Sequence, residues 1–207
     1  MAILDEPVVV VEQHNRPLRF PSVYEFFSSD GRRLGHARAR LPHPVWLPFY
    51  LFFIRGLGKI TVDLFHEDGT RLGSFVRPSI TSRGKQFTSF DVLDGAGNPV
   101  GMLRKVRPQQ TMPQYELLDR QGQRVASMLF LQKGVLAPQE KREVIRYLAA
   151  DGQLLASMQW SLAKWRGVWF AVERLECSYA SNALSISEKL LMLAGVMTLD
   201  SYFWAGF

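Results

Sequence analysis

The chain holds few groups in an arrangement that supports catalysis. Cys177 is its single cysteine. A catalytic thiol requires a neighbouring base, and the sequence around Cys177 identifies none, so a buried or merely free thiol is the better interpretation. No histidine pairs with another histidine or with the cysteine at a zinc-site spacing. The sequence therefore predicts no catalytic residue, no metal site and no cofactor. The four histidines are His14, His36, His43 and His66.

Two further motifs have a simpler explanation than chemistry. The segment 55–59, Arg-Gly-Leu-Gly-Lys, is superficially similar to a phosphate-binding loop, but the full Gly-x-x-x-x-Gly-Lys-Ser/Thr pattern is absent and a strand is expected to follow it instead of a helix. Without a helix N-terminus to receive phosphate, we expect a connector. The acidic pair Glu67 and Asp68 precedes a glycine, where Asp commonly forms turns.

Basic side chains are the more suggestive group. Lys plus Arg total 25 against 19 Asp plus Glu, and residues 1–110 hold 15 basic and 10 acidic side chains. The arginine guanidinium is a planar fork that matches phosphate oxygens. We therefore treat one set of side chains as candidate lipid- or anion-binding residues, with a solvated barrel exterior as the alternative. The set comprises Arg32, Arg33, Arg38, Arg40, Arg104, Lys105 and Arg107.

An aromatic segment, 44–54, follows the first cluster of arginines. Its apolar part, 45–54, is shorter than the roughly 20 residues that a helical membrane span needs. Trp and Tyr favour the boundary between lipid and water, so the segment is a candidate membrane-contact loop. A protein partner or packing on the barrel are the alternatives. The candidate contact residues are Trp46, Phe49, Tyr50, Phe52 and Phe53.

These residues need a scaffold, and a repeated pattern indicates a β-barrel. Five times, an apolar run enters a short polar turn containing glycine and a second apolar run leaves it, which is the signature of a β-hairpin. Strands at 8–12 and 168–176 bring the expected total to about twelve. The five repeats span 24–35, 62–73, 90–101, 115–126 and 145–156, with turn glycines at Gly31, Gly69, Gly97, Gly122 and Gly152.

The C-terminal segment predicts a helix over about 187–199. Ser185 and Glu188 have the spacing of a capping box, and residues 190–199 are apolar on every side of a helix. A helix of this kind is buried in protein or in lipid. Ten apolar residues reach about 15 Å, half of a bilayer core, so we expect a helix enclosed by the barrel.

The pattern as a whole indicates a mainly β protein, a closed antiparallel barrel around a C-terminal helix, in one domain over 1–207. The acidic start of the chain has no secretory character, and one cysteine permits no internal disulfide. We therefore expect a cytoplasmic protein, peripheral at the membrane inner face if it binds lipid, without a transmembrane span.

The ordered hairpins and the tail 186–203 resemble the tubby-like barrel superfamily, and within it the scramblase and LURP-one-related branch. The resemblance implies a closed barrel wrapped around the C-terminal helix. It implies no single activity, because tubby proteins bind phosphoinositides and scramblases are proposed to move lipids. The stretch 177–185 contains no acidic residue, unlike the calcium-binding segment of animal scramblases, so we expect no calcium site.

Three functional hypotheses follow. The first is a non-enzymatic, peripheral phospholipid-binding module whose basic face meets anionic head groups. The second is a soluble scaffold or regulator that binds a protein through the 44–54 loop. The third and weaker one is an enzyme with an unrecognised site. We expect no nucleic acid partner, and the net charge of +6 by itself specifies no ligand.

Overall fold

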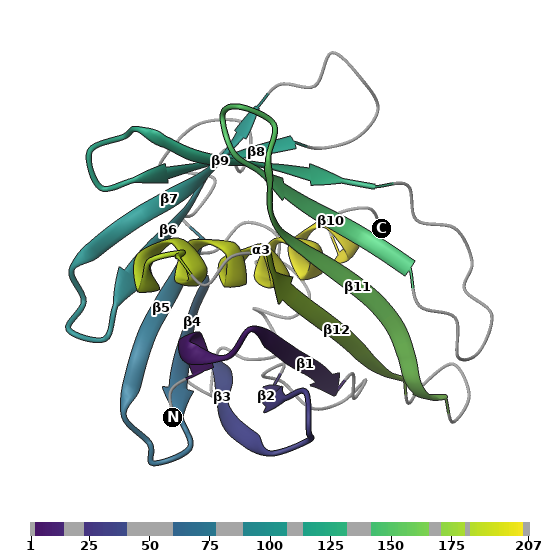
Figure 1. The fold of residues 1–207 in the computed structure, drawn as a ribbon. Coiled ribbons are helices and arrows are strands. Elements are labelled where there is room, and N and C mark those ends of the chain that lie inside the picture. The colour runs from purple at the N-terminus through teal and green to yellow at the C-terminus, as the bar shows by residue number, and fades with distance from the viewer. Residues whose placement is uncertain are drawn as a thin grey trace.

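The computed structural model describes residues 3–14, 23–40, 60–77, 89–106, 114–131, 142–165, 171–180 and 183–204. In this part of the chain, twelve strands form one closed antiparallel barrel, in which β1 pairs with β12 to complete the circle (Figure 1). The predicted fold class is confirmed. The elements are η1 (Ile3–Asp5), β1 (Val8–His14), β2 (Val23–Ser28), β3 (Arg33–Arg40), β4 (Ile60–His66), β5 (Arg71–Arg77), β6 (Ser89–Asp94), β7 (Pro99–Val106), β8 (Gln114–Asp119), β9 (Arg124–Phe130), β10 (Arg142–Leu148), β11 (Leu154–Trp165), β12 (Ala171–Tyr179) and α3 (Ile186–Trp204).

The five predicted hairpins are all present, and each turns at the predicted glycine. All five glycines have positive φ, between 79° and 92°, which side chains with a Cβ rarely adopt. The turns share one hydrogen-bond pattern: in the first, the Gly31 amide donates to the Ser28 carbonyl at 3.0 Å. Local turn chemistry therefore sets the register of each hairpin.

The last strand differs from its prediction. We expected a strand ending at Glu176, whereas β12 continues to Tyr179. Cys177 pairs with Val9 of β1, and Tyr179 pairs with Ala156 of β11. The strand extends beyond its apolar run because β12 pairs with β1 on one side and β11 on the other, and because the side chains of Cys177 and Tyr179 are buried inside the barrel.

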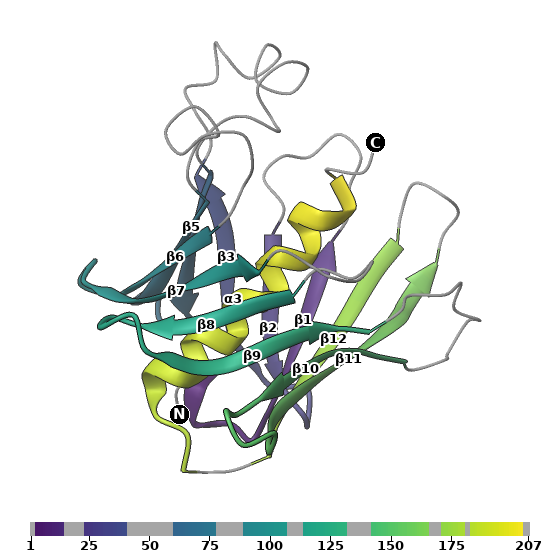
Figure 2. The same cartoon turned by 90° about the horizontal axis from the view of Figure 1, so that it is seen from above.

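Helix α3 lies inside the barrel, as predicted, and Leu190 to Val196 are all buried (Figure 2). The capping box is confirmed, because the Ser185 amide donates to the Glu188 carboxylate at 2.7 Å and the Glu188 amide to the Ser185 hydroxyl at 3.2 Å. The helix extends past the predicted end at Leu199 to Trp204, since residues 200–204 include neither glycine nor proline.

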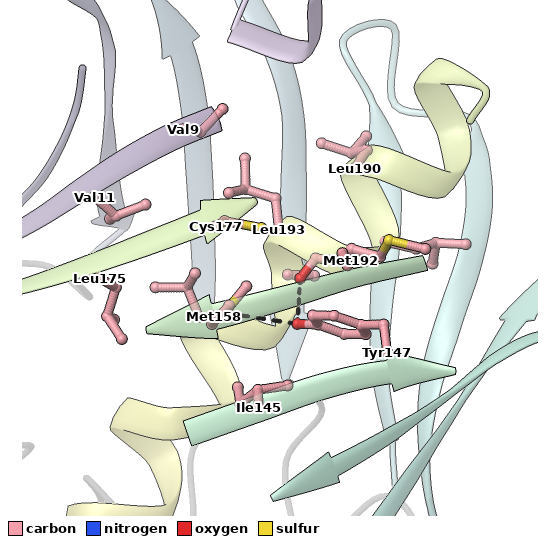
Figure 3. Close-up of a cluster of buried hydrophobic side chains, with 14 of the residues drawn as sticks. Val9, Val11, Ile145, Tyr147, Met158, Leu175, Cys177, Leu190, Met192 and Leu193 are labelled. Carbon is pink, nitrogen blue, oxygen red and sulfur yellow. Dashed lines mark hydrogen bonds between the residues drawn. The ribbon is translucent and has the colours of Figure 1, made fainter. Parts of the chain in front are cut away.

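Small residues let the helix approach the wall. A Cβ on Gly73 would lie 3.1 Å from the Leu190 side chain, and one on Gly195 would lie 2.0 Å from the Tyr147 hydroxyl. That hydroxyl donates to the Met192 carbonyl of α3 at 2.6 Å (Figure 3). The barrel interior at this level is therefore filled by side chains of the helix and the wall.

The order of the strands gives the barrel two distinct ends. All five tight turns lie at one end, the turn end, together with η1 and the start of α3 (Figure 2). The strands meet their other connections at the opposite end, the loop end. Those connections are residues 15–22, 41–59, 78–88, 107–113, 132–141 and 166–170, which lie outside the described residues.

Candidate functional site

The outer face of β3 carries two of the candidate arginines near the loop end. Arg38 and Arg40 are exposed, while Ala37 on the alternate face is buried in the core. Arg40 donates hydrogen bonds through Nε and Nη2 to the carboxylate of Asp63 on β4. The bond from Nη2 is 2.8 Å long. Arg38 forms no ion pair with another described residue.

Asp63 is almost wholly buried although it lies on the outer face of the sheet. Burial raises the pKa of its carboxyl group, but hydrogen bonds from Arg40 and Ser74 outweigh that effect and hold the pKa below its ordinary value. The Ser74 hydroxyl donates at 2.7 Å. Asp63 therefore remains ionised and neutralises one candidate arginine.

Arg32 and Arg33 lie at the turn end. The guanidinium of Arg32 pairs with Glu6 at 2.8 Å and that of Arg33 with Glu25 at 3.0 Å, and about half of each arginine side chain is exposed. Seven residues at about 3.3 Å each separate Arg33 from Arg40 by about 23 Å along β3. The structure therefore does not bring the four arginines of this hairpin into one patch.

The second basic group divides between the two faces of β7. Arg104 is exposed on the outside and pairs with Glu116 of β8 at 2.7 Å. Lys105 alternates with it and shares the inward face of Leu103, which is fully buried in the core. Arg107 lies outside the described residues. So do all the candidate membrane-contact residues, namely Trp46, Phe49, Tyr50, Phe52 and Phe53.

The interior contains ionisable groups that are closed to solvent. Burial raises the pKa of the Cys177 thiol to about 12. Burial also raises the pKa of the Tyr147 and Tyr179 hydroxyl groups well above the ordinary value. A neutral, inaccessible thiol is a poor nucleophile, so Cys177 has the character of a core residue.

Lys189, in the first turn of α3, is buried at the turn end. Its Nζ donates to the Leu4 carbonyl of η1 at 2.8 Å and lies 5.2 Å from the centroid of the Tyr179 ring. No role for Lys189 was predicted from the sequence. Its position directly before an apolar helical run was the available signal.

Comparisons of the chain with protein-family models, with curated proteins and with solved structures found no match. In the described part of the chain, no three His, Cys, Asp or Glu side chains gather closely enough to hold a metal ion. No described helix combines the length and the apolar character that crossing a bilayer requires.

Charge is distributed unequally between the sequences at the two ends. The six connections of the loop end contain ten basic residues and one acidic residue. The rest of the chain therefore holds 15 of the 25 basic and 18 of the 19 acidic residues. At the turn end, the five turns and residues 3–7 contain six acidic and two basic residues. All of the positive excess thus belongs to the loop-end connections.

Aromatic residues follow the same division. The six loop-end connections contain nine Phe, Trp or Tyr residues, whereas the five turns and residues 3–7 contain none. A count of charge by halves of the chain does not reveal this division. It becomes visible only when the strand order assigns alternate connections to opposite ends.

Proposed function

We propose that this protein is a non-enzymatic module that binds anionic phospholipid surfaces peripherally, with the loop end of the barrel towards the membrane. The observation that carries the proposal is the coincidence of basic and aromatic residues in the connections of one end. Each connection starts and finishes at strand ends on that side, so its charges are tethered there.

Charge supplies the first part of the attraction. Each Lys or Arg near an anionic surface contributes about 1 kcal/mol, and this contribution falls off within a Debye length. Ten basic residues against one acidic residue at the loop end favour approach by this end. The acidic turn end is repelled by the same surface, so the charge asymmetry also orients the barrel.

Aromatic residues supply the second part. Trp and Tyr occupy the interface between lipid and water, where a ring is partly buried and its polar atom stays wet. The connection 41–59 holds five of the nine loop-end aromatic residues. Basic residues and aromatic residues in the same connections provide both electrostatic attraction and apolar insertion, and stable peripheral attachment needs two such contributions.

The described arginines contribute unequally to this proposal. Arg38 and Arg40 lie on the loop-end half of β3, and Arg40 shares its charge with Asp63. Arg32 and Arg33 lie at the turn end and face away from a membrane bound in this orientation. The tubby-like resemblance is compatible with lipid binding, but the fold alone assigns no activity.

A soluble scaffold that binds a protein through the 44–54 loop is the second candidate. The observation that favours it is the pairing of Arg32, Arg33, Arg40 and Arg104 with carboxylates, which leaves the outer wall of the described barrel nearly balanced in charge. An enzyme remains the weaker alternative, because the described interior is packed with side chains.

Sedimentation with vesicles tests the proposal. The purified protein is mixed with phosphatidylcholine vesicles, with or without phosphatidylserine, over a series of salt concentrations. We expect sedimentation with the anionic vesicles that weakens as salt rises, and poor sedimentation with the neutral ones. No sedimentation with anionic vesicles at low salt contradicts the lipid proposal and favours the scaffold.

A further inference from the structure

Residues near the N-terminus pack into the turn end of the barrel. Ile3 and Leu4 of η1 are buried in the core, and η1 contacts both α3 and β2. A Cβ on Gly35 would lie 2.1 Å from the Phe65 carbonyl oxygen and 2.9 Å from the Ile3 side chain, so the glycine in β3 makes room for both. The Pro7 carbonyl accepts a hydrogen bond from the Tyr179 amide at 3.0 Å. We call residues 3–7 the N-terminal strap.

The strap supplies the hydrogen-bond acceptor for a buried charge. The Lys189 ammonium donates to the Leu4 carbonyl oxygen and lies over the face of the Tyr179 ring. A neutral carbonyl is a modest partner for a buried cation, since a carboxylate forms a shorter and stronger charge-assisted bond. The strap therefore places two buried apolar side chains and one carbonyl oxygen beside the Lys189 cation at the start of α3.

We propose that the strap is an intramolecular ligand, and that the recess it fills at the turn end binds an amphipathic carboxylate such as a medium-chain fatty acid. The carboxylate takes the place of the Leu4 carbonyl on Lys189. The alkyl chain takes the place of the Ile3 and Leu4 side chains against Gly35 and the start of α3. This site lies at the opposite end of the barrel from the proposed membrane surface and does not depend on that proposal.

Lys189 can be accommodated both when the strap is packed in place and when it is displaced. It stands in the first turn of α3 beside Ile186, Ser187 and the partly exposed Glu188. When the strap leaves, its long side chain can extend to water at the helix start. Arg32 is half exposed but its partner Glu6 is buried, so release of the strap separates the pair and returns the Glu6 carboxylate to water.

The strap competes with the ligand, which sets the design of the test. The apparent affinity for a ligand falls in proportion to the fraction of molecules whose site is free. Weakening the strap by Ile3→Ser with Leu4→Ser should therefore strengthen binding. The probe is decanoate below its micelle concentration, titrated calorimetrically into the protein. We expect the double variant to bind decanoate at least about tenfold more tightly than the wild type.

Lys189→Met in the strap-weakened background tests the cation. We expect it to weaken decanoate binding by about tenfold while leaving the affinity for neutral decanol within about twofold, because only the charged head group uses the ammonium. Equal decanoate affinity of the double variant and the wild type overturns the proposal. An unchanged decanoate affinity after Lys189→Met also overturns it.

Hydrogen exchange of the wild-type protein keeps the proposal testable if the variants fail to fold. With saturating decanoate, the amides of Ile3 to Glu6 should exchange faster, because the ligand displaces the strap, while those of Leu190 to Val196 stay protected. Unchanged exchange of the strap amides, or a general loss of protection in α3, contradicts the proposal.

Discussion

Tyr147, Cys177 and Tyr179 bring three weak acids into the barrel core. Burial raises the pKa of each, that of Cys177 to about 12. A thiol reagent at pH 8 should therefore modify native Cys177 only as fast as the protein opens, and should modify the denatured chain rapidly. Rapid stoichiometric modification of the native protein contradicts the burial of this residue.

The same pKa shifts predict a loss of stability in alkali. A group with a raised folded pKa contributes stability that is complete below its unfolded pKa and is lost as pH rises towards the folded value. For Cys177 that window runs from about 9 to about 12. Urea midpoints should fall over this range, and less steeply for Cys177→Ala. An identical slope in the variant contradicts the assignment to the thiol.

The contact between Gly195 and Tyr147 predicts a coupled pair of substitutions. Gly195→Ala should cost about 1–3 kcal/mol by overpacking, because the new methyl group meets the Tyr147 hydroxyl. Tyr147→Phe should lose about 1 kcal/mol with the hydrogen bond to Met192. Denaturation of the double variant should show less than the summed loss, since the hydroxyl is then absent. Strict additivity contradicts the contact.

At the scale of elements, the enclosure of α3 by the barrel can be tested by substitution. Leu193 is fully buried, whereas Ile186 on the same helix is 64% exposed. Leu193→Asp buries an unpaired charge and should abolish soluble folding, while the matched control Ile186→Asp should change stability by no more than about 0.5 kcal/mol. Solubility and thermal unfolding of the two variants check this. A cooperative, equally stable Leu193→Asp protein contradicts a central helix.

The elements show which features are local enough to predict. Each hairpin turn depends on a few adjacent residues and a glycine with positive φ, so the sequence places all five turns correctly. The end of β12 depends on pairing with Val9, more than 160 residues earlier, and is misplaced by three residues. The helix is predictable as an apolar run, but its contact with Leu4 through Lys189 joins distant parts of the chain.

At the scale of the whole molecule, topology changes the meaning of the basic residues. The sequence groups Arg32 with Arg40, whereas an eight-residue strand carries them towards opposite ends. The partners Glu6, Glu25, Asp63 and Glu116 are also invisible in the sequence, since strand pairing brings them beside the arginines. Strand order instead assigns the connections that hold the excess of basic residues to one end of the barrel.

Paired charge variants measure this orientation most directly. One variant carries Arg83→Gln and Lys85→Gln in the loop-end connection 78–88. Its control carries Arg120→Gln and Arg124→Gln, which are exposed at the turn end and give the same net charge. Binding of both to phosphatidylserine-containing vesicles is measured by sedimentation at low salt. At about 1 kcal/mol per charge, we predict about 30-fold weaker binding for the loop-end variant and a change below about twofold for the control. Equal weakening of both variants, or no effect of the loop-end pair, would contradict a membrane-facing loop end.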